Sequence, residues 1–390
     1  MTVKRLRRRI MRLLTYSAIM LFALGLIAFG KETSAAATEG LRLCASVLLP
    51  SLFPFFVISS LAVQTGLAGY AGRVFEKPMR LLFNVPGVCA PAFVLGLVGG
   101  YPVGARTAIS LYEQHLCTKE QTERLLAFCN NSGPAFILGA VGTAIFGGTA
   151  AGVLLYLSHI AASVAVGVVF RFRGSSSRGT AAACKYAVHA VSLKQAFSKA
   201  IVSSFAAVLN ICAFVIFFAV TIRLLFLTGV IPAAASLLGT LISPLGLDTA
   251  YAERLISGLF EVTSGISGLA DARASAGAKL SAAAFMLGWA GLSVHCQVLN
   301  FIGDSGLNAA PYIIGKLLHG FLSMGFAYAG FYFFPFDVQA SKMLSARISA
   351  IAELDAPRLL LVSVSAAAAV WAIFLLLSRI LYCKIKKDRL

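Results

Sequence analysis

The stretch FCNNSGPAFILGAVG, residues 128–142, places two asparagines, a serine, a glycine and a proline inside an otherwise apolar segment. Proline lacks an N–H group and its ring clashes with the carbonyl four residues earlier, so a continuous helix is disrupted at Pro134. Proline is also favoured at the first position of a helix. The sequence therefore predicts a break at the polar cluster and a half-helix that begins at Pro134 and runs through AFILGAVG.

The composition around this stretch is that of a membrane protein. Of the 390 residues, 59% are hydrophobic and only 12% are charged, and the mean hydropathy is +0.86. A soluble domain carries about 25% charged residues. Several apolar runs approach or exceed the roughly 20 residues that a helix needs to cross a bilayer. The clearest runs cover 13–29, 43–65, 149–170, 200–228, 309–335 and 358–382. Because they are continuous rather than alternating, we expect an all-α polytopic membrane protein, not a β-barrel.

The net charge of +18 is concentrated before the first apolar run, in the loop 173–199 and at the end of the chain. Loops rich in lysine and arginine stay in the cytoplasm, so this loop and both termini are expected there. Residues 31–42 and 337–358 balance their charges and are expected outside. The basic clusters indicate topology and contact with anionic membrane lipids, and no nucleic-acid partner is expected.

The first 37 residues have the basic start, apolar core and small residues of a signal peptide. The apolar core of about 17 residues is longer than the roughly 7–15 of a signal sequence, so an uncleaved first span is expected. The eight cysteines show no C-x-x-C pair and no histidine at metal-binding spacing, and we interpret them as small buried hydrophobes. With no P-loop, H-E-x-x-H or G-x-S-x-G motif, we expect no metal, no cofactor and no enzymatic activity.

Two halves of the chain repeat four elements in the same order, although their sequences match only weakly. Each half has a span, an amphipathic connector, a tip inside an apolar segment and a polar break. The tip and break read GLVGGYPVGA and FCNNSGPAFILGAVG in the first half, and GLFEVTSGISG and LGWAGLSVHCQVLNFIG in the second. The basic residues give the halves opposite orientations. Inverted repeats with re-entrant or broken helices are a transporter design.

These features divide the chain into five predicted parts. They are a basic N-terminus with the first span (1–40), a first repeat (41–172), a basic cytoplasmic loop (173–199), a second repeat (200–336), and an external segment followed by the last span and a basic C-terminus (337–390).

The candidate site in the first half combines the polar break with the glycine-rich tip. The positive end of the half-helix at Pro134 would face the cluster, and amides both donate and accept hydrogen bonds. We expect a small polar or anionic solute to bind Asn130, Asn131, Ser132, Gly133 and Pro134, together with Gly100, Tyr101 and Pro102 of the tip. Arg106 is either an anion ligand or an anchor to lipid headgroups. Thr118 and Gln121 predict a capped helix on the cytoplasmic surface at 118–128.

The second half contributes a less distinct set of polar residues. Placing the Glu261 carboxylate inside a membrane costs free energy unless it faces a cavity or a partner. It either carries a coupling proton or Na⁺, or pairs structurally with Lys279, Lys316 or Arg106. The further lining candidates are Thr263, Ser264, Ser293, His295 and Gln297. A lone histidine such as His295 is more often packed and hydrogen-bonded than functional, although it suits a pH response.

The stretch from LGLVGGYPVGARTAISLYEQHL to AFCNNSGPAFILGAVGTAIFG resembles the sporulation integral membrane proteins of the YlbJ type. That family lies within the nucleoside-recognition, or Gate, domain superfamily, which is similar to concentrative nucleoside transporters and to the membrane core of a ferrous-iron transporter. The match is specific over 93–147 and looser over the remaining spans. The second tip lacks the glycines of the first, and Glu261 is the one obvious acid, so Na⁺ coupling does not follow from the resemblance.

The resemblance implies a role in forming endospores. The implied task is to move dipicolinic acid (pyridine-2,6-dicarboxylate) across the mother-cell-derived outer forespore membrane, alone, as a homo-oligomer or with a second transport component. A planar dianion suits the half-helix, the two amides and Arg106, with Tyr101 stacked on the ring. Two alternatives stay open: a carrier for a nucleoside-type solute, and a non-transporting membrane scaffold for assembly of the spore envelope.

Overall fold

The computed structural model describes residues 3–45, 49–65, 67–173, 193–270, 272–303 and 305–336. Within these ranges helices are the only regular elements, which confirms the all-α class. The predicted external segment and the predicted last span at 358–382 lie outside the described residues.

The helices form two groups, one before and one after residues 174–192, which lie outside the described ranges. The N-terminal group is α1 (Val3–Ala28), α2 (Gly30–Leu43), α3 (Leu49–Gln64), α4 (Leu67–Phe83), η2 (Gly87–Cys89), α5 (Ala90–Gly99), α6 (Val103–Glu113), α7 (Lys119–Cys129), η3 (Ala135–Ile145) and α8 (Thr149–Phe170). The C-terminal group is α9 (Leu193–Leu227), α10 (Val230–Ile242), η4 (Ser243–Leu245), α11 (Thr249–Phe260), α12 (Val262–Ser267), η5 (Gly268–Ala270), α13 (Ala276–Trp289), α14 (Gly291–Ile302) and α15 (Ala310–Phe333).

Four helical segments in the described part of the chain are long and apolar enough to cross a membrane. They are Arg9–Ala28, Thr149–Phe170, Lys194–Leu227 and Ala276–Ile302, and the bent pair Gly72–Phe83 and Gly87–Gly99 forms a fifth candidate with a 94° break. The predicted span at 149–170 coincides with α8. The segment Ala276–Ile302 was not among the predicted spans, because polar residues and a break lower its hydropathy.

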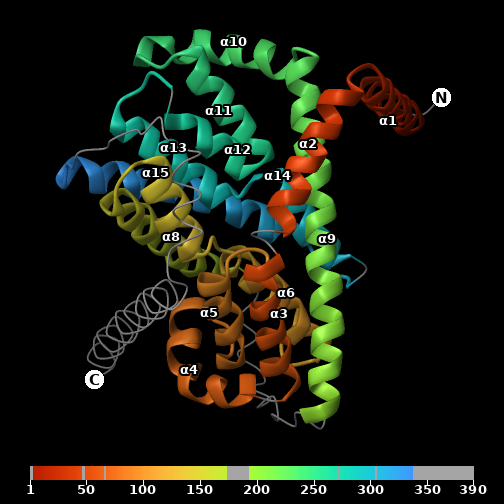
Figure 1. Cartoon of the computed structure of the whole chain (residues 1–390). Helices are drawn as coiled ribbons and strands as arrows, with labels where there is room; N and C mark the ends of the chain where they lie inside the picture. The colour runs from red at the N-terminus through yellow and green to blue at the C-terminus, as the bar shows by residue number, and fades with distance from the viewer. Residues whose placement is uncertain are drawn as a thin grey trace.

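Helices α8 and α15 lie at the centre of the molecule (Figure 1). The first-half helices α3 to α6 lie toward one end, α10 to α12 lie toward the other, and the long helix α9 runs along one side. α15 packs against α13 and also against α7 and α8, so it contacts both halves of the chain. α1 lies at the periphery, and its apolar side chains are exposed, as expected of a helix that faces lipid.

Residues 31–42, predicted to lie outside, are all helical in α2, and Gly40 lets α2 lie against α9, where an added Cβ would be 3.2 Å from Ile216 Cα. Two local expectations are corrected. Residues 193–199, expected in the basic loop, form the first turns of α9, because buried alanines one turn apart dock this end. The helix at 118–128 was expected on the surface, yet most of α7 beyond its first turn is buried, because it leads into the break.

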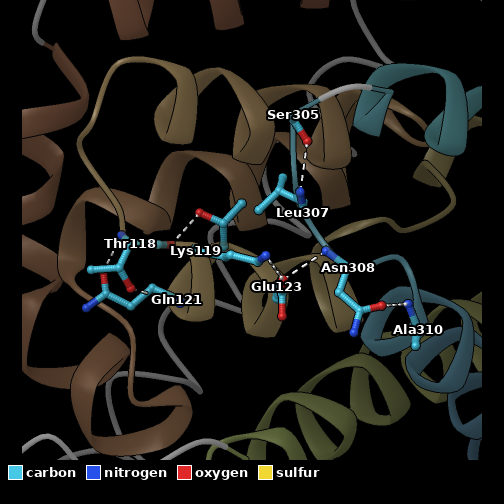
Figure 2. Close-up of polar contacts among 9 residues, drawn as sticks. Thr118, Lys119, Gln121, Glu123, Ser305, Leu307, Asn308 and Ala310 are labelled. Atoms are coloured by element: carbon cyan, nitrogen blue, oxygen red, sulfur yellow. Dashed lines mark hydrogen bonds and ion pairs between the residues drawn. The ribbon is translucent and has the colours of Figure 1, made fainter.

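The start of α7 is fixed by the predicted capping box. Thr118 Oγ1 accepts a hydrogen bond from Gln121 N at 3.3 Å, and Thr118 N donates to Gln121 Oε1 at 3.0 Å (Figure 2). Glu123 Oε1 accepts from Asn308 N at 2.8 Å, and Asn308 Oδ1 accepts from Ala310 N at 2.9 Å (Figure 2). The first turns of α7 and α15 are therefore held together.

Six of the eight cysteines lie in described ranges, and none of the six is in a disulfide. Five of them are buried and Cys296 is half-buried, which confirms their interpretation as small packed side chains. Cys184 and Cys383 lie outside the described residues.

The close approach of α15 to α7 yields a stability prediction. In Gly315→Ala the added Cβ would lie 2.3 Å from Ala127 O and 2.7 Å from Ala127 Cα. We expect α15 to shift away from α7 and the free energy of unfolding to fall by about 1–3 kcal/mol. The thermal unfolding midpoint of the detergent-solubilised protein should fall accordingly. Gly325→Ala on the same helix is the matched control, because nothing lies within 4 Å of its Cβ. Equal midpoints for the two variants would contradict the contact.

Candidate functional site

The break in the first half separates α7 from η3. After Cys129 the chain becomes extended, with φ −95° and ψ 91° at Asn130. Pro134 is helical again, with φ −62° and ψ −34°, and Ile137 N donates to Gly133 O at 3.1 Å. The predicted half-helix is therefore confirmed. It has the wider π geometry, which is rare in proteins and occurs frequently at functional sites.

The glycine-rich tip between α5 and α6 packs directly on this break. Gly100 has φ +80°, a backbone conformation that favours glycine, and an added Cβ would be 3.0 Å from Gly133 N. A Cβ at Gly96 or Gly104 would be 2.0 Å from Cys129 O. The Tyr101–Pro102 peptide bond in the tip is cis. The glycines thus let the backbone of the tip touch the backbone of the break.

The second half contains a tip and a break in the same contact. Glu261 is extended between α11 and α12, and its carboxylate accepts from Thr263 N at 2.9 Å and from Ser264 N at 2.7 Å. The break between α13 and α14 lies at Ala290 and Gly291, which have φ 72° and φ 80°. A Cβ at Gly291 would be 3.0 Å from Phe260 O, beside Glu261.

The two halves meet at these elements. α12 packs against η3, and α14 packs against α6. The tip of the second half therefore lies beside the half-helix η3 of the first half. Likewise α14, which follows the second break, lies beside α6, which follows the first tip.

A buried polar network connects the first break to α14 and α15. Lys316 Nζ donates to Asn130 O at 2.9 Å, and Asn130 Nδ2 donates to the Tyr312 hydroxyl at 3.4 Å. That hydroxyl lies 3.0 Å from His295 Nδ1. Lys316, Asn130 and Tyr312 have no exposed surface. A break in one half is thus bonded to side chains from the other.

Two stacked histidines extend the network to α8. Ser132 N donates to His159 Nε2 at 3.0 Å, and His319 Nε2 donates to His159 O at 2.9 Å. The two imidazole rings are 4.3 Å apart at their centroids. Lys316 Nζ lies 3.5 Å from His319 Nδ1 and 5.9 Å from the centre of the Tyr101 ring. Four segments of the chain therefore converge around one lysine side chain.

The hydrogen bonds assign the tautomers of two histidines. His159 Nε2 accepts from a backbone N–H, so its hydrogen lies on Nδ1 in the neutral ring. The Tyr312 hydroxyl accepts from Asn130, which leaves its one hydrogen able to donate to His295 Nδ1; in that arrangement His295 carries its hydrogen on Nε2. In the described structure both hydrogens are buried without an acceptor, as is the Tyr101 hydroxyl.

Unpartnered acceptors are also present in the described part of the site. Asn130 Oδ1 and Asn131 Oδ1 are buried and make no hydrogen bond there. Buried polar groups are almost always hydrogen-bonded in native proteins, so a cluster of exceptions is a candidate for binding a polar ligand. The cluster offers donors on the histidine and lysine side and acceptors on the amide side.

The structure does not bring all of the predicted site residues into this network. Arg106 Nη1 lies 3.6 Å from a Glu113 carboxylate oxygen, and its guanidinium stacks over Phe301. Gln297 Nε2 lies 3.4 Å from Ser293 Oγ, on a different face of α14 from His295. In the described ranges none of these three makes a hydrogen bond to the network.

Glu261 has a local structural role. Besides the two backbone N–H groups, its carboxylate accepts from Ser264 Oγ at 2.8 Å. The carboxylate therefore caps the short helix α12, together with Thr263 and Ser264. Over the described residues it forms no ion pair with Lys316 or Arg106, two of the partners proposed from the sequence.

Four residues of the network were missed by sequence reasoning. They are His159, Tyr312, Lys316 and His319, of which Lys316 had been considered only as a partner of Glu261. The signal was present, because the three residues of α15 are spaced i, i+4 and i+7 and therefore share one helix face. An ionisable residue inside a predicted span is a functional candidate by default.

Comparison with known proteins shows what the region around this arrangement is similar to. Residues 45–176 match the Gate family, described as nucleoside recognition. The chain is 29% identical over 329 residues to the sporulation integral membrane protein YlbJ of Bacillus subtilis strain 168, an alignment that covers 80% of this chain and 81% of YlbJ. The resemblance is confirmed. No solved structure matches the chain.

The matched region contains the whole first tip and break, from α5 to η3. With the apolar helices described above, the resemblance to YlbJ supports a multi-pass integral membrane protein, of which residues 45–176 are similar to the Gate family. The alignment to YlbJ extends well beyond the Gate segment, because 80% of the chain cannot be contained in residues 45–176.

The network yields a second stability prediction. Tyr312→Phe removes the hydroxyl that bonds Asn130 and His295. We expect the free energy of unfolding to fall by about 1–3 kcal/mol, because two buried polar groups lose their hydrogen bond. Tyr328→Phe on the same helix is the control, because Tyr328 is 60% exposed and surface changes stay within about 0.5 kcal/mol. Thermal unfolding of both variants in detergent tests this, and a Tyr312→Phe midpoint as high as that of Tyr328→Phe would show that the bonds do not matter.

Proposed function

We propose that this membrane protein is a secondary transporter of a small carboxylate, dipicolinate, across the outer forespore membrane during sporulation. The observation that carries the proposal is Lys316, a fully buried basic residue bonded to the backbone of a broken helix. Intramembrane ionisable residues that line a site mark substrate and ion pathways. The role in sporulation is inferred from the similarity to YlbJ.

The chemistry of the site supports an anionic solute. Beside Lys316 lie the unpartnered Nδ1–H of His159, the Nε2–H of His295 and the hydroxyl of Tyr101. Carboxylate oxygens accept hydrogen bonds, and those from charged donors are about twice as strong as neutral ones. The Tyr101 ring, close to Lys316, offers a flat face to an aromatic solute. A planar dicarboxylate satisfies these groups together.

We further propose that residues 41–172 and 200–336 are inverted repeats. Support comes from the equivalent order of elements, since each half has a tip, a break and then a long helix that ends in the core. Gly100 meets Gly133 in the first half, and Glu261 meets Gly291 in the second. The network is buried, so a solute reaches it only when the repeats move relative to one another. The charge distribution supports cytoplasmic termini.

A nucleoside-type carrier is the second candidate. The matching family is described as nucleoside recognition, and the free amide oxygens of Asn130 and Asn131 suit the N–H groups of a neutral base. The lysine separates the two candidates, because a neutral solute does not require a buried positive charge. We do not propose enzymatic activity. The proposed partners are membrane lipids and either further copies of this chain or a second membrane component.

Transport is tested by dipicolinate uptake into liposomes that carry the purified protein. We expect the Asn130→Ala/Asn131→Ala double variant to lose most uptake, because a buried polar site without its partners loses about 1–3 kcal/mol of binding per contact. The matched control is Asn210→Ala/Asn300→Ala, which removes two exposed amides from apolar helices. Uptake that survives in a folded Asn130/Asn131 variant would reject this site.

No uptake by folded wild-type protein, with and without proton and Na⁺ gradients, would favour the scaffold. Uptake of a nucleoside without dipicolinate uptake would favour the second candidate.

The position of the positive charge gives a separate prediction. Lys316→Gln is expected to lower dipicolinate uptake at least tenfold. A tenfold loss corresponds to about 1.4 kcal/mol, the size expected for one charge-assisted hydrogen bond. Arg106→Ala should leave at least half of the uptake, because Arg106 pairs with Glu113 and Phe301 outside the network. Initial uptake rates for the two variants, normalised to the amount of folded protein, show which of the two basic residues binds the anion. A reversed order would restore Arg106 as the anion ligand.

A further inference from the structure

Lys316 has no acidic partner among the described residues. Its amine contacts Asn130 O at 2.9 Å and His319 Nδ1 at 3.5 Å, and it lies 5.9 Å from the centre of the Tyr101 ring. All three are uncharged, and the side chain is fully buried. An ammonium ion that is buried without a counter-charge is strongly disfavoured. These surroundings therefore favour an uncharged amine.

The hydrogen-bond geometry matches an amine with two hydrogens. His319 Nε2 faces the carbonyl of His159 at 2.9 Å, so the ring hydrogen lies on Nε2 and Nδ1 is an acceptor. Both contacts of Lys316 Nζ are thus acceptors, and two N–H groups satisfy them. A third N–H, which only the charged form has, finds no acceptor in the described part of the chain.

The groups that act electrostatically on Lys316 come from every side of the site. They are His319 on α15, His159 on α8, Cys129 at the end of α7, Tyr101 in the first tip and His295 on α14. None of them is a carboxylate. α13, which also packs on α15, carries one titratable residue, Lys279, near its start.

We propose that the transported anion and a proton bind to this site together, with Lys316 Nζ as the proton acceptor. This inference rests on the proposed function. The proton comes from the aqueous solution, where an O–H bond of a hydronium ion or buffer acid breaks as an N–H bond forms with the lone pair of the amine. The third N–H then donates to a carboxylate oxygen of the anion. No other bond changes. A dianion that binds in this way crosses the membrane with one positive charge beside it.

The coupling is measured by isothermal titration calorimetry of dipicolinate into the full-length protein in nanodiscs. Titrations at about pH 8 in two buffers of different ionisation enthalpy, phosphate and Tris, give the number of protons taken up per bound anion. We expect about one proton for the wild type, and an affinity that falls about tenfold per pH unit wherever the free amine is uncharged, by linkage. Lys316→Arg should take up none and keep a constant affinity, because a guanidinium is always charged.

Two further variants keep the outcome clear. Lys199→Arg, an exposed lysine on α9, should behave as the wild type. Lys316→Gln, for use if Lys316→Arg does not fold, should bind more weakly and take up no proton. Wild-type binding without proton uptake would overturn the inference and leave the transport proposal standing. Equal proton uptake by Lys316→Arg would show that Lys316 is not the proton acceptor, and would also leave the transport proposal standing. No binding of dipicolinate by folded wild type would overturn the proposed function and this inference with it.

Discussion

A helix that is broken inside a bilayer leaves backbone groups that water cannot reach, and the protein must supply partners for them. At the break between α7 and η3, Lys316 bonds Asn130 O and His159 bonds Ser132 N. The Ser163 hydroxyl donates to Phe128 O at 2.8 Å. These partners come from α8 and α15, so the two central helices must lie where they do for the break to be stable.

Close backbone contact is the second condition for this arrangement. The tip reaches the break because Gly96 and Gly104 leave room for Cys129 O, and α15 reaches α7 because Gly315 leaves room for Ala127. Packing between small residues replaces the hydrophobic effect as the source of helix association in a membrane. The same contacts hold Lys316 within hydrogen-bonding distance of Asn130, so stability and site geometry have a common origin.

The groups that stabilise the break are also those that face the proposed solute. Lys316 bonds the carbonyl at the end of α7 and is the charged ligand proposed for the anion. A solute that binds Lys316 therefore acts on the contact that joins the first break to α15. This gives a direct physical link between binding in the centre and the relative positions of the two halves, which a carrier with buried ligands requires.

The sequence by itself determined the all-α membrane class, the break at Pro134 and the capped start of α7 at Thr118, because each depends on local chemistry: apolar length, the missing proline N–H and a four-residue capping pattern. It did not determine the partners of the break. Arg106 follows the tip in sequence but pairs with Glu113, whereas Lys316 comes from a helix far along the chain. Only tertiary packing decided which basic group reaches Asn130, because that choice depends on where glycines allow distant helices to touch.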